Sequence, residues 1–426
     1  MKAIVLAAGE NSRFWPFGRD RHKCMYEVGT GKPVLFYTLQ EIADADLKEV
    51  IMIVRENDIA IENYCKSYAP KGLEISFLYQ TKPLGMGDAL LSASEFLGDD
   101  EHFIVLNPNN INSASIIKRV IDKKNSVDKT GLVLVTQKTN SPHKFGIVEV
   151  SDDRVLSIEE KPELPKSDLR VVGVYCLSKK FIEYLKKFDG EYSLESALQK
   201  FILDGNKVYH VEITRDHYLP SLKYPWDLLS INRFLLERDA VSNDDRHGLY
   251  KTQGVIIEGQ VVLGNRVRFL GRASIKGPCC IGNDVVIGDD SVIRDHSFIG
   301  NNCVIGCRTE IKNSILGSGV HTHYNFIGDS IIGDNCRLGA GTMIANRRVD
   351  RKIIKSLIKG KKIETGSVSL GVMMGLETKT GINVSIMPGI KIGNNCIIGP
   401  QTLVNEDVED NQICYSVGSV SKKVRL

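Results

Sequence analysis

Two cationic side chains follow a glycine-containing loop near the start of the chain. The short apolar run Lys2–Ala7 reads as a strand, and the residues after it are small or cationic at defined spacings: Ala8, Gly9, Arg13 and Lys23. Small residues allow backbone N–H groups to approach a triphosphate closely, and two fixed cations can neutralise its charge. The stretch therefore predicts a phosphate-binding loop at the end of a strand.

A second apolar run, Phe103–Leu106, ends abruptly in small polar residues. Strand ends of this kind are where α/β enzymes usually place their chemistry. Here the side chains are amides, at Asn107, Asn109 and Asn110, and no carboxylate is among them. Two readings stay open at this point: an active-site edge without its charge, or only a turn.

The elements that must position these residues alternate along the first half of the chain. Expected strands are Lys2–Ala7, Glu49–Val54, Ile75–Tyr79 and Phe103–Leu106, and expected helices are Val34–Ala45, Ile59–Tyr68 and Asp88–Phe96. This order predicts a Rossmann-like α/β domain, with a mostly parallel sheet and helices on both faces.

The second half of the chain has a period of six residues. Aliphatic residues recur at this spacing in three runs: Ile281, Ile287, Ile293, Ile299 and Ile305; then Ile332, Leu338 and Ile344; then Ile386, Ile392, Ile398 and Val404. This period is typical of a parallel β-helix built from hexapeptide repeats, with three hexapeptides in each coil. The expected fold is a left-handed β-helix.

The two halves set the expected boundaries. Tyr224–Arg238 reads as a helix opened by Pro225. We therefore expect a first domain over residues 1–236, a linker over 237–250, a β-helix domain over 251–418 and a tail over 419–426.

Within the β-helix, the insertion Arg347–Gly366 interrupts the period with a basic run of eight side chains: Arg347, Arg348, Arg351, Lys352, Lys355, Lys359, Lys361 and Lys362. Such a run is usually a solvated face. It is equally the place where a solenoid carries a loop that binds an anion such as a phosphate.

Composition narrows the class of protein. The chain has 426 residues, 42% of them hydrophobic, and its net charge of +3 is too small to favour nucleic acid or a membrane surface as a partner. No apolar segment approaches about 18 residues, and Met1 leads directly into a strand without a signal-peptide pattern, so a cytoplasmic location is expected. The ten cysteines lack paired CxxC spacing and read as reduced core thiols.

Over residues 1–236 the sequence resembles the sugar-1-phosphate nucleotidylyltransferases, through the pattern LAAG-x3-R-x2-P-x6-K-x-M. The resemblance implies attack by a sugar-phosphate oxygen on the α-phosphorus of a nucleoside triphosphate, with Mg²⁺ spreading the developing charge. It assigns the triphosphate to Ala8, Gly9, Arg13 and Lys23, and the base to Gln80 and Gly85 in "QTKPLGMGDAL". It assigns the sugar to Gly146 in "FGIVEV" and to Glu160 and Lys161 in "IEEKP".

The departures from that family fall mainly at its metal site. Asn109 and Ser221 stand where the family has the two carboxylates that bind Mg²⁺. Neutral oxygens are far poorer partners for a hard cation, so no metal ligand is assigned and use of Mg²⁺ stays open. Asp88 or Asp227 could compensate, although Asp227 also reads as a helix-start residue.

Two further departures concern the sugar and the cationic loop. The position of the family's sugar-contacting Asn holds Val171, and Lys23 is followed by Cys24 where the family usually has Pro.

Residues 251–410 resemble the acetyltransferase half of the bifunctional GlmU-type enzymes, especially the archaeal ones, through "TEIKNSILGSGVHTHYNFIGDS" and "GAGTMIAN". In that family a His at a cleft between adjacent subunits takes a proton from the amine of a hexosamine 1-phosphate, which attacks acetyl-CoA. Spacing assigns this role to His323, with His321 as the alternative.

The same resemblance assigns the other substrate contacts of the acetyltransferase site. Lys312 would pair with the sugar phosphate, Asn346 with the sugar or amine, and Glu310 matches an upstream family Glu. The family's Tyr falls on Phe326, with Tyr324 nearby.

Together these observations predict a bifunctional enzyme that assembles as a homotrimer through its β-helix. Its substrates would be small molecules, namely an amino-sugar 1-phosphate, acetyl-CoA and a nucleoside triphosphate. Acetyl transfer is the expected reaction. One alternative is an active nucleotidylyltransferase with a structural β-helix. Another is a non-catalytic regulatory subunit, similar to the nucleotidylyltransferase-like subunits of the eukaryotic translation-initiation exchange factor.

Overall fold

The computed structural model describes residues 1–19, 21–56, 58–81, 85–97, 101–188, 190, 193–240, 254–417 and 420–425. Contacts divide the chain into two compact units, each discontinuous in sequence. The first unit comprises Met1–Glu10 and Val34–Ser221, and the second comprises Asn11–Pro33 and Leu222–Leu426. The segment that carries Arg13 and Lys23 therefore belongs to the second unit.

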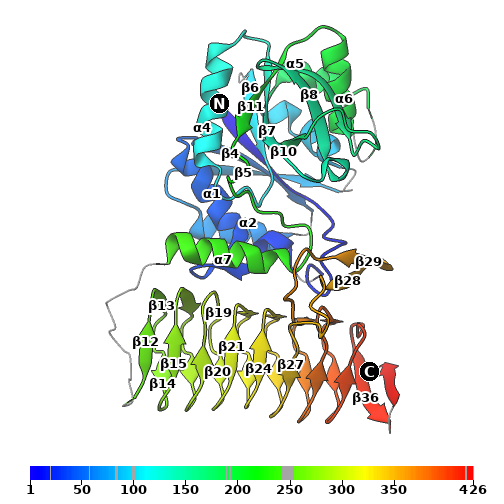
Figure 1. Ribbon diagram of the computed structural model, residues 1–426. Coiled ribbons are helices and arrows are strands. Elements are labelled where there is room, and N and C mark those ends of the chain that lie inside the picture. Colours follow the sequence, from blue (N-terminus) through cyan, green and yellow to red (C-terminus); the bar gives the residue numbers. More distant parts are fainter. Residues whose placement is uncertain are drawn as a thin grey trace. The chain divides into compact units, whose positions relative to one another are not determined.

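The first unit is built on one nine-stranded sheet (Figure 1). Four strands at one side are parallel: β5 (Glu74–Gln80), β4 (Glu49–Arg55), β1 (Lys2–Ala7) and β6 (His102–Leu106). The sheet continues through five more strands: β10 (Leu169–Ser178), β7 (Leu132–Lys138), β11 (Val208–Ile213), β9 (Arg154–Glu160) and β8 (Gly146–Ser151).

The expectation of a mostly parallel sheet is wrong for this second half. β10 runs antiparallel to both of its neighbours, β6 and β7, and β8 and β9 form an antiparallel pair. Residues 152–153 join β8 to β9, and so short a link reverses the chain, since a parallel crossover needs roughly a dozen residues or more. β9 and β10 run in the same direction, because β9 is antiparallel to β11, β11 is parallel to β7, and β10 is antiparallel to β7.

Helices flank the sheet (Figure 1). They are α1 (Val34–Asp44), α2 (Ile59–Tyr68), α3 (Met86–Ser92), α4 (Ala114–Ser126), α5 (Lys179–Leu185) and α6 (Ser193–Leu203). In α1, Leu35, Leu39 and Ile42 follow helical spacing and are fully buried. The expected helix Asp88–Phe96 is instead α3 followed by a separate 3-10 turn, Ser94–Leu97.

The second unit begins, after the segment Asn11–Pro33, with helix α7 (Asp227–Asp239). Asp227 is the first residue of α7, and its carboxylate accepts hydrogen bonds from the backbone N–H groups of Lys223 (2.6 Å) and Tyr224 (2.9 Å) in the turn before the helix. Residues 237–239 of the expected linker thus lie in α7, while 241–250 lie outside the described residues. The segment Asn11–Pro33 itself contains the 3-10 turn Lys23–Met25 and the short pair β2 (Glu27–Val28) and β3 (Lys32–Pro33).

The rest of the second unit is a left-handed parallel β-helix made of three stacked sheets. The β24 sheet contains β12 (Ile256–Glu258), β15 (Ser274–Lys276), β18 (Val292–Ile293), β21 (Glu310–Lys312), β24 (Phe326–Gly328), β27 (Met343–Ile344), β32 (Ser385–Ile386) and β35 (Leu403–Val404). The β25 sheet contains β13 (Val261–Leu263), β16 (Cys279–Ile281), β19 (Phe298–Ile299), β22 (Ile315–Leu316), β25 (Ile331–Ile332), β30 (Met373–Met374) and β33 (Lys391–Ile392). The β23 sheet contains β14 (Arg268–Phe269), β17 (Val286–Ile287), β20 (Val304–Ile305), β23 (His321–Thr322), β26 (Arg337–Leu338), β31 (Lys379–Thr380), β34 (Ile397–Ile398), β36 (Gln412–Val417) and β37 (Val420–Arg425).

The aliphatic residues of the six-residue period form the core of this β-helix, which confirms the sequence prediction. Corners between the sheets need backbone with positive φ, and Asp or Asn often supplies it, as at Asp284, Asp290 and Asn302. The insertion Arg347–Gly366 contains an antiparallel hairpin, β28 (Lys355–Ile358) with β29 (Lys361–Glu364). Most of the expected tail is strand β37, which pairs antiparallel with β36.

The structure bears on the expectations for the cysteines and for membrane-spanning segments. The ten cysteines are free, and all except Cys307 are buried. Across the described ranges, no helix has the length and apolar character needed to span a membrane.

Candidate functional sites

The two cations assigned to the triphosphate lie close enough to interact. Burial lowers the pKa of Lys23, and the positive charges of Arg13 and Lys223 lower it further, while Asp227 opposes them. Arg13 itself is exposed. Like charges held together gain from an anion placed near both, which suits a phosphate-binding role.

The small residues of the loop have different surroundings. Ala8 is buried, whereas Gly9 is exposed and a Cβ built on it would meet no atom within 4 Å. Neither packing within the chain nor a positive φ therefore requires glycine at position 9. The open space beside Gly9 would allow a ligand to approach the backbone closely.

The two residues assigned to the base flank a gap in the described chain. Gln80 ends β5, is buried, and its Nε2 atom donates to Oδ2 of Asp88 at 2.5 Å. Gly85 precedes α3 with a φ of 114°, a conformation that favours glycine. Residues 82–84 between them lie outside the described part of the chain.

The three residues assigned to the sugar come together on the β8–β9 pair. Gly146 faces Glu160 across the strands, and a Cβ at Gly146 would come within 2.9 Å of the Glu160 Oε2 atom. Lys161 Nζ lies 2.9 Å from Oε1 of Glu160. Glycine at this position leaves room for the carboxylate in its present orientation.

A second carboxylate in this region, that of Glu195, was missed by sequence reasoning. Oε2 of Glu195, in α6, is buried and has no hydrogen-bond partner in the described part of the chain. Burial raises the pKa of Glu195, and the negative charge of Glu160 raises it further. No motif marks Glu195, because its neighbours in sequence read only as an ordinary helix.

Two asparagine side chains after strand β6 form hydrogen bonds with the segment that precedes Ser221. Asn109 Nδ2 donates to the carbonyl oxygen of Pro220 at 3.0 Å, directly beside Ser221. Asn112 Nδ2 likewise donates to the carbonyl oxygen of Tyr218 at 3.1 Å. The structure therefore brings the two positions of the expected metal pair side by side, and a hydrogen bond to the backbone joins them.

These residues do not fit a Mg²⁺ site with two carboxylates. Over the described ranges, no cluster of three or more His, Cys, Asp or Glu could hold a metal. The two compensating carboxylates are already engaged: Asp88 accepts from Gln80, and Asp227 accepts from the backbone of the turn that precedes α7. The Asn109 Nδ2 atom is engaged with the carbonyl oxygen of Pro220, and the remaining amide oxygen is neutral, so it is a poorer ligand for Mg²⁺ than a carboxylate.

In the β-helix, two residues assigned to the amino sugar meet at one buried carboxylate. Asn346 Nδ2 donates to Oδ2 of Asp329 at 2.5 Å, and Lys312 Nζ lies 3.7 Å from the same oxygen. Asn313 Nδ2 donates to the other oxygen at 2.6 Å. Asp329 is only 4% exposed, so its charge is stabilised mainly by these partners. The sequence analysis assigned no role to Asp329, which served only to align the motif that contains His323.

The two remaining assigned residues are separate from that cluster. His323 is exposed at the corner after β23, and its imidazole ring makes no hydrogen bond or ion pair within the described part of the chain. Glu310 lies opposite Phe326 and pairs with Arg294 at 3.0 Å. His323 and the Asp329 cluster thus lie beyond opposite ends of β24.

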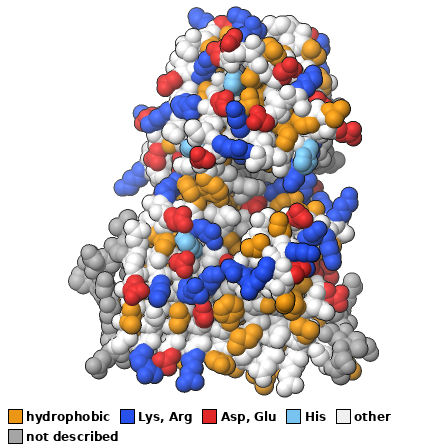
Figure 2. Space-filling model, viewed as in Figure 1, with side chains coloured by type: hydrophobic (Ala, Val, Ile, Leu, Met, Phe, Trp, Pro, Cys, Tyr) orange, Lys and Arg blue, Asp and Glu red, His pale blue; other side chains and the backbone are white. Residues whose placement is uncertain are grey.

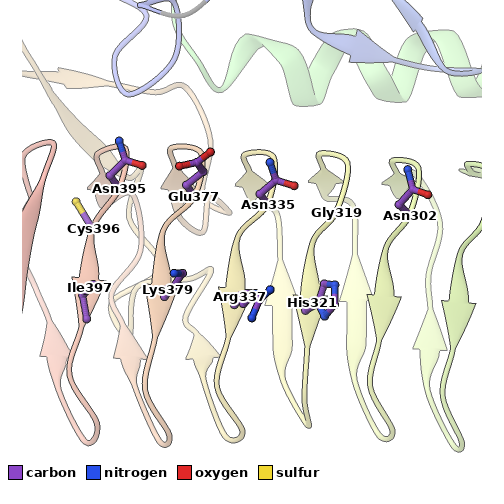
Figure 3. Close-up of a pocket in the computed structure, with 10 residues that line it drawn as sticks. All are labelled: Asn302, Gly319, His321, Asn335, Arg337, Glu377, Lys379, Asn395, Cys396 and Ile397. Atoms are coloured by element: carbon purple, nitrogen blue, oxygen red, sulfur yellow. The ribbon is translucent and has the colours of Figure 1, made fainter.

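The alternative histidine, His321, lines a groove of about 650 Å³ on the β23 sheet. Figure 3 shows His321, Arg337, Lys379 and Ile397 on successive strands, with Asn302, Gly319, Asn335, Glu377 and Asn395 at the turns beside them. Burial lowers the pKa of His321, and the positive charge of Arg337 lowers it further. In the groove, the His321 imidazole therefore lies at one end of a row that continues through the cationic side chains of Arg337 and Lys379.

Comparison with known proteins places both units in described families. A family model described as Nucleotidyl transferase matches residues 2–226. Models described as GMPPB C-terminal domain and as Bacterial transferase hexapeptide (six repeats) match residues 275–379 and 375–406. A crystal structure of a Bacillus anthracis protein named as a glucose-1-phosphate thymidylyltransferase covers 57% of this chain and 98% of its own, with a TM-score of 0.50. Its 23% identity supports the fold alone.

Full-length relatives share both units. The bifunctional protein GlmU of Methanocaldococcus jannaschii is 33% identical over 421 residues, which is 97% of each chain. The bifunctional sugar-1-phosphate nucleotidylyltransferase/acetyltransferase of Sulfurisphaera tokodaii is 31% identical and covers 96% of this chain and 98% of its own. The chain therefore belongs to the nucleotidyl transferase family and, over nearly its whole length, to the GlmU-like bifunctional sugar-1-phosphate nucleotidylyltransferase/acetyltransferases.

Proposed function

We propose that this transferase of sugar-nucleotide biosynthesis moves an acetyl group from acetyl-CoA to the amine of an amino-sugar 1-phosphate, in its β-helix unit. The observation that carries the proposal is the meeting of Lys312 and Asn346 at the buried Asp329 carboxylate. Burying a carboxylate is costly unless it is paired and hydrogen-bonded. Here it holds a cation and an amide in fixed positions, and these are the two groups needed to bind a sugar phosphate.

The proposed reaction needs one base and a charged binding group. The amine nitrogen attacks the thioester carbonyl, so a C–N bond forms and the C–S bond breaks. His323 takes the proton that the amine loses, and this proton passes to the departing CoA thiolate. Lys312 attracts the sugar phosphate, while Asn346 orients the sugar or the amine.

His323 and the Asp329 cluster lie apart within one chain, which supports a site shared between neighbouring copies in a homotrimer. The β24 sheet also presents apolar side chains outward: Met343, Met387 and Leu403 are 39%, 41% and 47% exposed. Figure 2 shows apolar side chains gathered on one face of the β-helix, below a band of basic ones. Apolar surface of this kind is suited to burial against a second copy.

Thiol release from acetyl-CoA with glucosamine 1-phosphate tests the proposal. We expect His323→Ala to lower the rate by roughly 10²- to 10⁴-fold, the usual contribution of a general base. His321→Ala is the matched variant, and it should retain most of the rate. If instead His321→Ala abolishes thiol release, the groove of Figure 3 holds the base. If neither variant changes the rate, both assignments are wrong.

A second candidate function is nucleotidyl transfer by the nucleotidyl transferase domain. The proximity of Gly146, Glu160 and Lys161 on β8–β9 favours it, and so does the Arg13–Lys23 pair. The described side chains do not fit the family's metal pair, so we derive no step through Mg²⁺. Pyrophosphate release over the common NTPs, with and without Mg²⁺, tests this function. Absence of turnover in both assays would support a regulatory role instead.

A further inference from the structure

One corner of the β-helix, between the β25 and β23 sheets, carries a ladder of side-chain hydrogen bonds. At this corner a side-chain oxygen accepts from the backbone N–H of the equivalent residue one coil earlier. The donor and acceptor residues are Asn265 to Asn283, Asn283 to Asn301, Asn301 to Ser318, Ser318 to Asp334, Leu376 to Asn394, and Asn394 to Asp410. The donor–acceptor distances run from 2.7 Å between Asn283 and Asn301 to 3.2 Å between Asn301 and Ser318.

The ladder needs an oxygen and not a charge. Asparagine supplies that oxygen at positions 283, 301 and 394, and serine supplies it at position 318. Only Asp334 and Asp410 are acidic among these acceptors. Their charge is therefore more than the corner itself requires.

Each of these two carboxylates meets an arginine of the segment Asn11–Pro33. Asp334 forms an ion pair with Arg21, and Asp410 forms one with Arg19. Asp410 Oδ1 also accepts from Nε1 of Trp15 at 3.0 Å. Both partners lie in the second unit, so the segment is attached to the β-helix at two acidic corners, three coils apart.

A buried lysine adds a third attachment. Lys391 is only 4% exposed, and its Nζ atom lies 4.5 Å from the centroid of the Trp15 ring and 3.2 Å from Oδ2 of Asp407. A cation over an aromatic face is favourable, most of all when both are shielded from water. Asn394 Nδ2 also approaches the carbonyl oxygen of Pro16 at 3.4 Å.

The attached segment is the one that carries Arg13 and Lys23. We propose that Asp334 and Asp410 are positioning residues for the nucleotide: the β-helix holds the segment Asn11–Pro33, and through it the two phosphate-binding cations, in one arrangement. This inference rests on the nucleotide site assigned to Arg13 and Lys23. Without the two ion pairs the segment samples other arrangements, and the measured affinity falls with the fraction that is competent to bind.

The conservative variants Asp334→Asn and Asp410→Asn separate this role from a structural one. Each keeps the oxygen that the ladder uses and removes only the charge, as asparagine already does at neighbouring corners. The matched control is Asp284→Asn, since Asp284 pairs with Arg266 elsewhere on the β-helix and does not contact the segment. Isothermal calorimetry of the full-length protein with each common NTP gives the dissociation constant.

We expect nucleotide affinity to fall roughly three- to tenfold for each variant and by more for the pair, with Asp284→Asn unchanged. Hydrogen exchange without nucleotide should accelerate within residues 11–33 of the double variant and not within the β-helix core. Arg21→Gln combined with Asp334→Asn should weaken nucleotide binding no more than Arg21→Gln alone, because the charge of Asp334 acts on the segment through Arg21.

The outcomes separate the two claims. If the wild type binds an NTP and the double variant binds it equally well, the positioning role is overturned while the nucleotide site stands. Equal weakening by Asp284→Asn also overturns the role, because the effect would then be one of general stability. If the wild type binds none of the NTPs, the nucleotide site fails and the positioning role fails with it.

Discussion

Asn109 in the first unit and Asn346 in the second unit both donate a hydrogen bond from Nδ2, but to different kinds of acceptor. Asn109 donates to a neutral backbone carbonyl, that of Pro220. Asn346 donates to a buried carboxylate, that of Asp329, which also lies near Lys312. Asn109 is therefore joined to a neutral group, whereas Asn346 is joined to a charged carboxylate that is surrounded by polar side chains.

The two units therefore differ in the charge of the groups around these two positions. At the edge of β6 the expected carboxylate positions hold Asn109 and Ser221, so a cation gains little there. In the β-helix, Asp329, Asp334 and Asp410 each meet a cationic side chain. Charges of this kind can orient substrates or a neighbouring segment, because they act in partly buried surroundings.

Of the changes that test this comparison, removing the carboxylate of Asp329 should have the largest effect on stability and on acetyl transfer. Asp329→Ala leaves Lys312, Asn313 and Asn346 without their shared partner, so we expect a loss of about 2–4 kcal/mol in the free energy of unfolding. Acetyl transfer should fall roughly a hundredfold, as is common when a group that orients substrate is misplaced. Chemical denaturation and thiol release measure the two effects.

Asp350→Asn is the matched control for this loss, because its partner Arg348 is exposed and the pair lies on the surface. That variant should stay within about 0.5 kcal/mol of the wild type. Full acetyl transfer by Asp329→Ala at saturating substrates would place the cluster outside the site.

Introducing a carboxylate at position 109, after strand β6, should have an intermediate effect on stability and on pyrophosphate release. Asn109→Asp loses the hydrogen bond to Pro220 and places a carboxylate beside a carbonyl oxygen, which costs about 1 kcal/mol or more without a cation. With Mg²⁺ we expect the thermal-unfolding midpoint to recover and pyrophosphate release to rise about tenfold.

Asn112→Asp provides the control, since Asn112 makes the same kind of bond to the carbonyl of Tyr218. An equal response of both variants to Mg²⁺ would show that the effect is not specific to position 109.

The smallest effect concerns Glu195, the carboxylate with a buried and unpaired oxygen. Burial raises its pKa in the folded state, so the folded protein holds this proton more tightly than the unfolded chain does. Its contribution to stability is therefore complete below the unfolded pKa of about 4.3, and it is lost as pH rises through the folded pKa.

Glu195→Gln should then be more stable than the wild type at pH 7 by up to about 1 kcal/mol, and the advantage should vanish below about pH 4. Thermal unfolding across this pH range measures the difference, with the exposed Glu163→Gln as the control. An advantage that persists at acid pH would mean that ionisation of Glu195 is not its cause.

Much of the fold could be predicted because it depends on local spacing. Strand Lys2–Ala7 and helix Ile59–Tyr68 begin and end as expected, and the six-residue period marks the β-helix core. The antiparallel course of β10 was not predicted, because the sequence does not show that β10 lies between β6 and β7 in the sheet.

Some residues of the candidate sites could likewise be predicted from the sequence, and others could not. The resemblance supplied Lys312 and Asn346, which the structure brings together, but not the carboxylate that joins them. Glu195 was missed for a similar reason, since only burial distinguishes it from an ordinary helical glutamate. The assignments of His323 and His321 stay predictions.

By itself, the sequence determined the fold of each half and the kinds of side chain available, because periodicity and short motifs act over a few residues. Only the tertiary structure decided which of these side chains meet. Asn109 and Pro220 are 111 residues apart in the chain, and Arg21 and Asp334 are 313 apart. Whether such groups meet depends on how the whole chain folds, since no local preference brings residues so distant into contact.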